Sequence, residues 1–176
     1  SGKSSVLHAG LVPALRAGAL PSSGAWLVAA MVPGPHPLAV YEAALAGPAP
    51  EDGARVVVVI DQFEEVFSVA DDADRLPFLR TLIAAVGDPS GLVTIVLALR
   101  GDFYDRPLLY PEFASVFTAG IVNVTPMTAT ELEAAVVRPA HRAGVEADSA
   151  RVAALVADSI GRPGGLPLLQ DTLTEL

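Results

Sequence analysis

The residues with the clearest chemical potential open the chain: Ser1-Gly2-Lys3-Ser4-Ser5. They match the second half of the phosphate-binding pattern G-x-x-x-x-G-K-[ST], which normally joins a strand to a helix. In such a loop, successive backbone N–H groups surround a polyphosphate, the lysine reaches its terminal phosphates, and the hydroxyl holds Mg²⁺. These five residues therefore predict a phosphate site.

Only this half of the pattern is present, so we expect the chain to begin inside the loop, with the first glycine and a strand before Ser1. The other interpretation is an ordinary helix N-terminus capped by Ser1. An apolar helical stretch follows at once, and Lys3 is the only lysine in the chain. Lysine offers phosphate a compact, mobile charge, whereas arginine offers a planar fork. Both observations favour the phosphate site.

A second group of charged residues follows the apolar run over residues 55–60, which predicts a buried parallel strand. Asp61 ends this run, where a carboxylate at the sheet edge can hold the Mg²⁺ that bridges phosphates. Glu64 and Glu65 come on the next turn, close enough to orient a water or accept its proton. Alternatively, Asp61 caps the following helix while both glutamates favour its dipole.

Arg100 ends the next apolar run, over residues 92–99. A charge buried there is costly unless an anion lies nearby. A γ-phosphate is one such anion, and a salt bridge to Asp61 or Asp102 is the other interpretation. We expect His8, on the first helix, to serve only as a surface or packing residue.

The elements that must position these groups alternate along the chain. Helical spacing predicts a first helix up to Arg16, in which Pro13 introduces a kink or an early end. Strands are expected over residues 26–32, 55–60, 92–99 and 120–124, and further helices over 38–46, 74–86 and 110–117. Strands alternating with helices indicate right-handed crossovers and a parallel α/β sheet, with ligands bound outside the carboxyl ends of its strands.

The pattern changes after Pro126, and three helices follow without a strand. They are expected over residues 129–141, with a capping box of Thr128 and Glu131, and over 148–160 and 165–176. Pro167 lies in the first turn of the last one. We therefore predict a core over residues 1–125 and a small helical subdomain over 126–176.

Composition excludes several classes of protein. The 176 residues carry a net charge of −9, which argues against a nucleic-acid surface because phosphate neutralisation needs clustered cations. The chain has no cysteine, so disulfides and cysteine-based zinc sites are excluded, and an intracellular, cytoplasmic location is expected. Its histidines are too widely spaced for a metal cluster, and no apolar run reaches membrane-spanning length.

Several phrases together resemble one family, the STAND class of signal-transduction ATPases, and most closely the bacterial novel STAND NTPase domain. The resemblance covers the whole chain. The phrases are Gly2-Lys3-Ser4-Ser5 leading to Gly10-Leu11-Val12-Pro13-Ala14-Leu15, then residues 58–67 (VVIDQFEEVF), 97–104 (LALRGDFY) and 165–169 (GLPLL). Each is modest alone, but four in this order are specific.

The resemblance implies a three-layer P-loop NTPase core of the additional-strand type, with strand order 5-1-4-3-2 and a helical lid behind it. The first, central strand is expected to be missing. The resemblance implies ATP or ADP with Mg²⁺ as cofactors, and a role for each matching residue. Ser1, Gly2, Lys3, Ser4, Ser5 and the lid residue Pro167 would bind nucleotide, Ser4 and Asp61 would hold the metal, and Arg100 would be a sensor.

Gln62 departs from the pattern of many P-loop ATPases, which place a glutamate directly after the metal-binding aspartate. The role of activating water then passes to Glu64 or Glu65. The favoured function is an ATP-binding, slowly hydrolysing switch in a larger protein, self-associating through this domain and carrying repeat or effector domains in the same chain. The rival is a degenerate P-loop scaffold that acts as an interaction module without turnover. The sequence leaves open the signal, the effector, the oligomer size and ATP against GTP.

Overall fold

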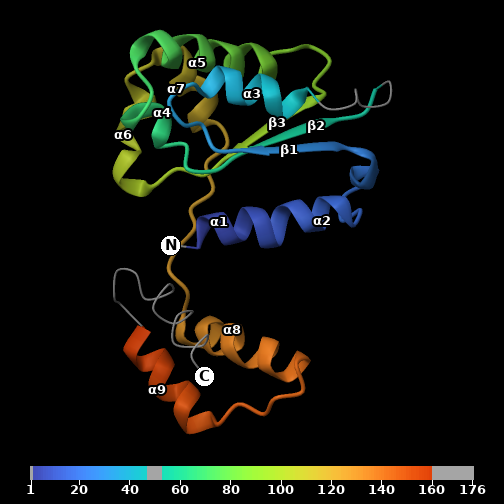
Figure 1. Cartoon of the computed structure of the whole chain (residues 1–176), viewed down its shortest axis with the longest axis vertical. Helices are drawn as coiled ribbons and strands as arrows, with labels where there is room; N and C mark the ends of the chain where they lie inside the picture. Colours follow the sequence, from blue (N-terminus) through green and yellow to red (C-terminus); the bar gives the residue numbers. More distant parts are fainter. Residues whose placement is uncertain (1, 47–52, 160–176) are drawn as a thin grey trace. The chain divides into compact units, whose positions relative to one another are not determined.

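The computed structural model of the chain describes residues 2–46 and 53–159 (Figure 1). The chain divides into two compact units. One spans Lys3–Val122, and the other contains Gly2 and the chain from Asn123 onward.

Three parallel strands form the sheet of the larger unit in the described residues. They are β1 (Leu27–Met31), β2 (Val56–Ile60) and β3 (Val93–Leu97), in the order β1-β2-β3. Their ends are in register, because Ile60 pairs with Met31 on one side and with Leu97 on the other. The predicted α/β class with a parallel sheet is therefore confirmed, and the carboxyl ends of all three strands meet at one edge.

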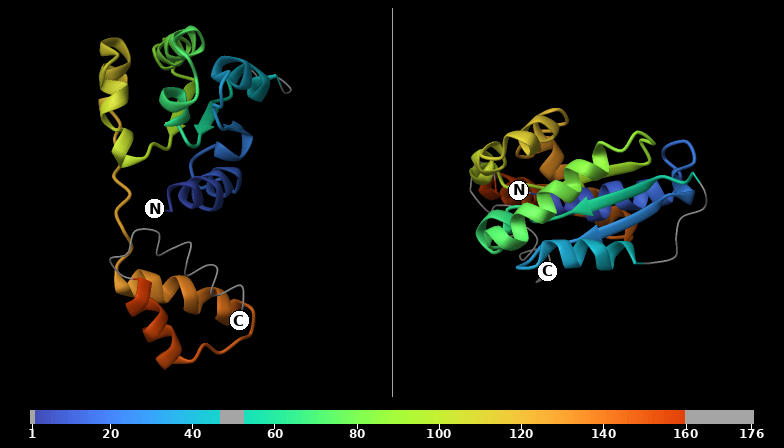
Figure 2. Two further views of the ribbon diagram at one scale, coloured as in Figure 1. Left: turned by 60° about the vertical axis from the view of Figure 1, so that its left-hand side comes forward. Right: turned by 90° about the horizontal axis from the view of Figure 1, so that it is seen from above.

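Helices cover both faces of this sheet (Figure 1). On one face lies the continuous helical segment α1 (Lys3–Ser5), η1 (Val6–Leu11) and α2 (Val12–Arg16). On the other lie α3 (Pro37–Leu45), α5 (Asp72–Val86) and α7 (Pro111–Thr118). Seen from above in Figure 2, α3 and α5 run alongside the strands. Short turns complete the unit: η2 (Ser23–Ala25), α4 (Glu65–Ser68), η3 (Gly101–Phe103) and α6 (Asp105–Leu108).

The middle strand β2 explains these three layers. Its side chains alternate between the faces, and all of them from Val57 onward are buried. Val57 and Val59 pack with the first helical segment, whereas Val58 and Ile60 pack with the helices of the opposite face. A continuous apolar run suits a parallel strand because both of its faces are covered.

Pro13 shapes the first helical segment without ending it. The segment widens into a π-helix over η1, where the Val12 N–H donates to the Leu7 carbonyl. Proline has no N–H, and its ring clashes with the carbonyl four residues earlier, which explains an altered turn just before it. The segment then ends in a Schellman motif, with Gly18 at φ +78°. The Gly18 N–H donates to Leu15 and the Ala19 N–H to Ala14.

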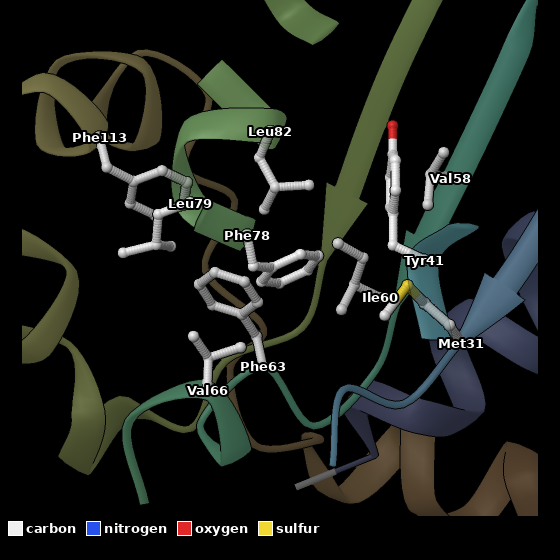
Figure 3. Close-up of a cluster of buried hydrophobic side chains, with 10 residues drawn as sticks. All are labelled: Met31, Tyr41, Val58, Ile60, Phe63, Val66, Phe78, Leu79, Leu82 and Phe113. Carbon is white, nitrogen blue, oxygen red and sulfur yellow. The ribbon is translucent and has the colours of Figure 1, made fainter. Parts of the chain in front are cut away.

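The larger hydrophobic cluster anchors the turn that follows β2 (Figure 3). Phe63 and Val66 are fully buried in it, between the end of β2 and the side chains of α5. The Phe63 ring stacks on Phe113 of α7 with centroids 5.7 Å apart. The Phe63 N–H also donates to the Ala98 carbonyl, just after β3. These contacts fix the backbone of the turn that directly follows Asp61.

The strand expected over residues 120–124 is absent. The segment has no regular structure, and the Val122 side chain is 86% exposed. A strand is stable only when a neighbouring strand pairs with its backbone groups, and this segment pairs with none of the three strands of the described sheet. Its apolar composition therefore misled the sequence prediction.

The second unit contains α8 (Ala129–Arg142) and α9 (Ser149–Ser159), two helices drawn in Figure 2. They bury a small hydrophobic cluster between them. The predicted capping box is confirmed. The Glu131 N–H donates to the Thr128 hydroxyl, and the Thr128 N–H donates to the Glu131 carboxylate. The helix expected over 165–176 lies outside the described residues. No described helix is long and apolar enough to cross a membrane.

Candidate functional site

Asp61 is the only buried charged residue in the described part of the chain, with 4% of its surface exposed. It directly follows β2, and its N–H donates to the Met31 carbonyl at 2.9 Å. Its Oδ1 accepts the N–H of Gln62 at 2.9 Å, and its Oδ2 lies 3.2 Å from Nε2 of His8. Gln62 has φ +52°, in the left-handed region that non-glycine residues rarely adopt. The chain therefore turns sharply here and holds the carboxylate at the sheet edge.

The contact with His8 brings the first helical segment to the same edge. Ser4 lies four residues before His8, so the two residues share roughly one face of the segment. The Ser4 and Ser5 side chains are exposed, and Lys3 is half-buried. The charge of Lys3 is also one of the causes that lower the pKa of Asp102, after the hydrogen bond from Arg100. The start of the segment thus lies near the ends of β2 and β3.

In the predicted phosphate loop, the structure describes the backbone of Gly2 and of the residues after it. Gly2 has φ +73°, a conformation that glycine adopts without strain. The helical segment begins at Lys3, directly after Gly2, and the N-terminus of a helix is the kind of position at which proteins bind anions. Ser1 lies outside the described residues.

Glu64 and Glu65 turn toward different neighbours. The Glu65 Oε2 accepts the N–H of Gly34, in the loop after β1, at 3.0 Å. The Glu64 Oε2 accepts the N–H of Arg100, after β3, at 3.3 Å. The two carboxylates therefore join the turn after β2 to the ends of both neighbouring strands, and only Glu64 lies beside Arg100.

The apolar run before Arg100 suggested that its charge would be buried. In the structure, 57% of the Arg100 side chain is exposed. Of the interactions considered for it, the structure shows the salt bridge to Asp102. Its Nε donates to Asp102 Oδ1 at 3.1 Å and its Nη2 to Oδ2 at 2.8 Å. This pairing raises the pKa of Arg100 and lowers that of Asp102. The guanidinium also lies 5.9 Å from the ring centre of Phe103.

His8 is exposed, as expected for a surface residue, but its contact with Asp61 was not anticipated. Its spacing of four from Ser4 was the available signal, since it puts the ring one turn from a predicted metal ligand. The involvement of Gly34 had no such signal, because its contact with Glu65 depends on how two loops meet.

A comparison with family models decides the identity. Residues 1–176 match the family described as Novel STAND NTPase 1. The chain belongs to this family. No curated protein and no solved structure matches it. The resemblance drawn from the sequence is thus confirmed over the whole chain.

For a STAND NTPase, the question is whether the side chains at this edge of the sheet suit Mg²⁺ bound together with a nucleotide. A carboxylate and an exposed hydroxyl, from Asp61 and Ser4, suit a hard cation that prefers oxygen ligands. The described residues hold no group of three His, Asp or Glu side chains that could bind a metal by themselves. Mg²⁺ commonly binds through one or two carboxylates together with substrate phosphates and water. The residues present therefore fit a metal that arrives with a nucleotide. Pro167 lies outside the described residues.

Proposed function

We propose that this STAND NTPase domain binds ATP with Mg²⁺, hydrolyses it slowly, and acts as a switch in a larger signalling protein. The observation that carries the proposal is the contact between His8 and Asp61. It holds the first helical segment against the buried carboxylate at the sheet edge, and Ser4 lies one turn before His8 on that segment.

Each residue then has a task in binding. The N–H groups that follow Gly2 surround the phosphates, and Lys3 neutralises their charge. The Ser4 hydroxyl and the Asp61 carboxylate hold Mg²⁺, with Ser1 and Ser5 completing the phosphate loop. Held by Ser4 and Asp61, Mg²⁺ would supply positive charge against the charge that develops on the phosphates during transfer.

Glu64 is the better candidate to orient the attacking water. Its carboxylate lies beside Arg100, which as a sensor would face the γ-phosphate. Both carboxylates accept a main-chain N–H, but the partner of Glu65 is Gly34, in the loop after β1 on the other side of β2 from Arg100. In this proposal Arg100 exchanges Asp102 for the γ-phosphate, a group that ADP lacks.

Nucleotide identity would be passed to the helical subdomain through Pro167. ATP and ADP can act as a switch only if they bind two conformations with different affinities, and such coupling is reciprocal. The output would be self-association through the NTPase domain and a change in effector or repeat domains of the same chain, in the cytoplasm.

A second candidate is a degenerate scaffold that binds partners without turnover. Two observations favour it: Gln62 stands where many P-loop ATPases have a glutamate, and Arg100 is engaged by Asp102. Phosphate release by the full-length protein separates the candidates. The switch predicts slow release that Lys3→Ala abolishes. Release equal in the parent and in Lys3→Ala would reject it, and ATP binding without any release would support the scaffold.

A further inference from the structure

The environment of Asp61 needs an explanation that the proposed function does not supply. Its carboxylate has only 6% of its side-chain surface exposed, so it depends on protein groups for hydrogen bonds. One oxygen is served locally by the Gln62 N–H. The other lies 3.2 Å from Nε2 of His8, which is 53 residues away in the sequence. When this carboxylate is ionised it only accepts hydrogen bonds, so the contact is then a hydrogen bond in the tautomer of His8 that carries its hydrogen on Nε2.

Packing alone does not account for the position of His8. Its side chain is 48% exposed, so burial gives little reason for the ring to lie over Asp61. It belongs to η1, the π-helical stretch of the first segment. Such stretches inside α-helices occur frequently at functional sites. The same face of the segment carries Ser4, one turn earlier.

We propose that His8 is a positioning residue: its Nε2–H holds Asp61 Oδ2 and thereby orients the carboxylate for the Mg²⁺ that binds with the nucleotide. This inference rests on the proposed function, because it concerns the same metal. Groups that hydrogen-bond to metal ligands fix the orientation of those ligands, and losing one typically weakens metal affinity or activity about 10-fold to 100-fold. His8 itself touches neither the metal nor the phosphates in this account.

The chain offers a matched control. His36, before α3, makes the same type of contact, with its Nδ1 3.2 Å from Oδ2 of Asp74. Here, however, the side chains are 70% and 34% exposed, and Asp74 lies on α5. A histidine–carboxylate pair of the same length is thus present between two residues to which the proposed function gives no role.

The experiment measures binding of ATP to the full-length protein by calorimetry, with Mg²⁺ and with the metal chelated. We compare the parent with His8→Ala, His8→Gln and His36→Ala. Glutamine can present an N–H at about the reach of Nε2, so His8→Gln should restore much of the loss. We expect His8→Ala to weaken Mg²⁺-dependent ATP binding about 10-fold to 100-fold. Binding without Mg²⁺ should change little, and His36→Ala should match the parent.

Three outcomes would overturn the inference. If His8→Ala weakens ATP binding equally with and without Mg²⁺, His8 acts on the fold rather than on the metal. If His8→Ala binds as the parent does, or more tightly, the hydrogen bond does not orient Asp61 for Mg²⁺. In either case the proposed function survives. A parent protein without Mg²⁺-dependent ATP binding would instead reject both the inference and the proposed function.

Discussion

The Arg100 guanidinium and the Asp102 carboxylate form two parallel hydrogen bonds, of 3.1 and 2.8 Å, at the end of β3. Both side chains are more than half exposed. Exposed ion pairs contribute little to stability, because water competes for both partners. The pair can therefore open at low cost when a stronger anion arrives, which leads to the first prediction.

Arg100→Ala should lower the affinity for ATP about 10-fold while leaving the affinity for ADP nearly unchanged, as expected for one lost charged hydrogen bond. Asp102→Asn should raise the affinity for ATP, by a few-fold at most, because Arg100 no longer has to leave an anionic partner. Titration calorimetry with both nucleotides measures the ATP-to-ADP ratio. An unchanged ratio in both variants would show that Arg100 has no role in sensing the γ-phosphate.

Substitutions of Lys3 and of Asp61 should affect nucleotide binding and ATP hydrolysis to different extents. Lys3→Ala should weaken binding of both ATP and ADP, because it removes the charge closest to the phosphates. Asp61→Asn should reduce the Mg²⁺ dependence and the rate of hydrolysis more than it reduces binding. Nucleotide binding and phosphate release at several Mg²⁺ concentrations test this. If both variants release phosphate at the parent's rate, the nucleotide site does not include Lys3 or Asp61.

The two glutamates form a matched pair of neighbours. Glu64→Gln should slow phosphate release about 100-fold or more while retaining ATP binding, since positioned acid–base groups contribute roughly 10²–10⁴-fold. Glu65→Gln should retain most of the activity, because its oxygen still accepts from Gly34. Single-turnover hydrolysis distinguishes them. A slower Glu65→Gln beside an unaffected Glu64→Gln would reverse the assignment.

The capping box of α8 should make the second unit sensitive to acid. Hydrogen bonds from the backbone and then the side chain of Thr128 lower the pKa of Glu131 below its usual 4.5. A group whose pKa is depressed in the folded state contributes stability above its unfolded pKa and loses it as the pH falls through the folded pKa. The helical signal of the parent should therefore decline as the pH falls below about 4.5.

Glu131→Gln keeps an acceptor at the same position without a titrating group, so it is the control for this effect. Circular dichroism of thermal unfolding at neutral pH and at about pH 3.5 compares the two proteins. The acid-induced fall in melting temperature should be smaller in Glu131→Gln. Equal falls in both would show that other carboxylates control the acid response.

The sequence predicted those parts of the fold that depend on local signals. The run ending at Ile60 gave a strand buried on both faces, and Thr128 with Glu131 gave a helix start. It was wrong over residues 120–124, because a strand requires a partner that an apolar run does not reveal. The hydrophobicity of a segment can be read from its sequence, but the presence of a neighbouring strand cannot.

The candidate site was predictable to a similar extent. Asp61 follows the buried strand β2 and Arg100 follows β3, whose residues are only partly buried, and parallel strands bring such residues to one edge. The contacts made by His8 and Gly34 were not predictable, because each depends on how distant segments meet. The sequence left three partners open for Arg100: a phosphate, Asp61 and Asp102. Because the Arg100 side chain is exposed, its charge needs no buried anion, and the salt bridge to Asp102 is sufficient.

Hydrogen exchange on the full-length protein, with and without MgATP, tests most directly whether these segments form one nucleotide site. The account predicts that MgATP protects three separated segments together: the start of the first helical segment, the turn from Asp61 to Glu65, and the residues around Arg100. Lys3→Ala should abolish protection at all three. Protection confined to one of them, or protection that persists in Lys3→Ala, would contradict the claim that they bind a single nucleotide.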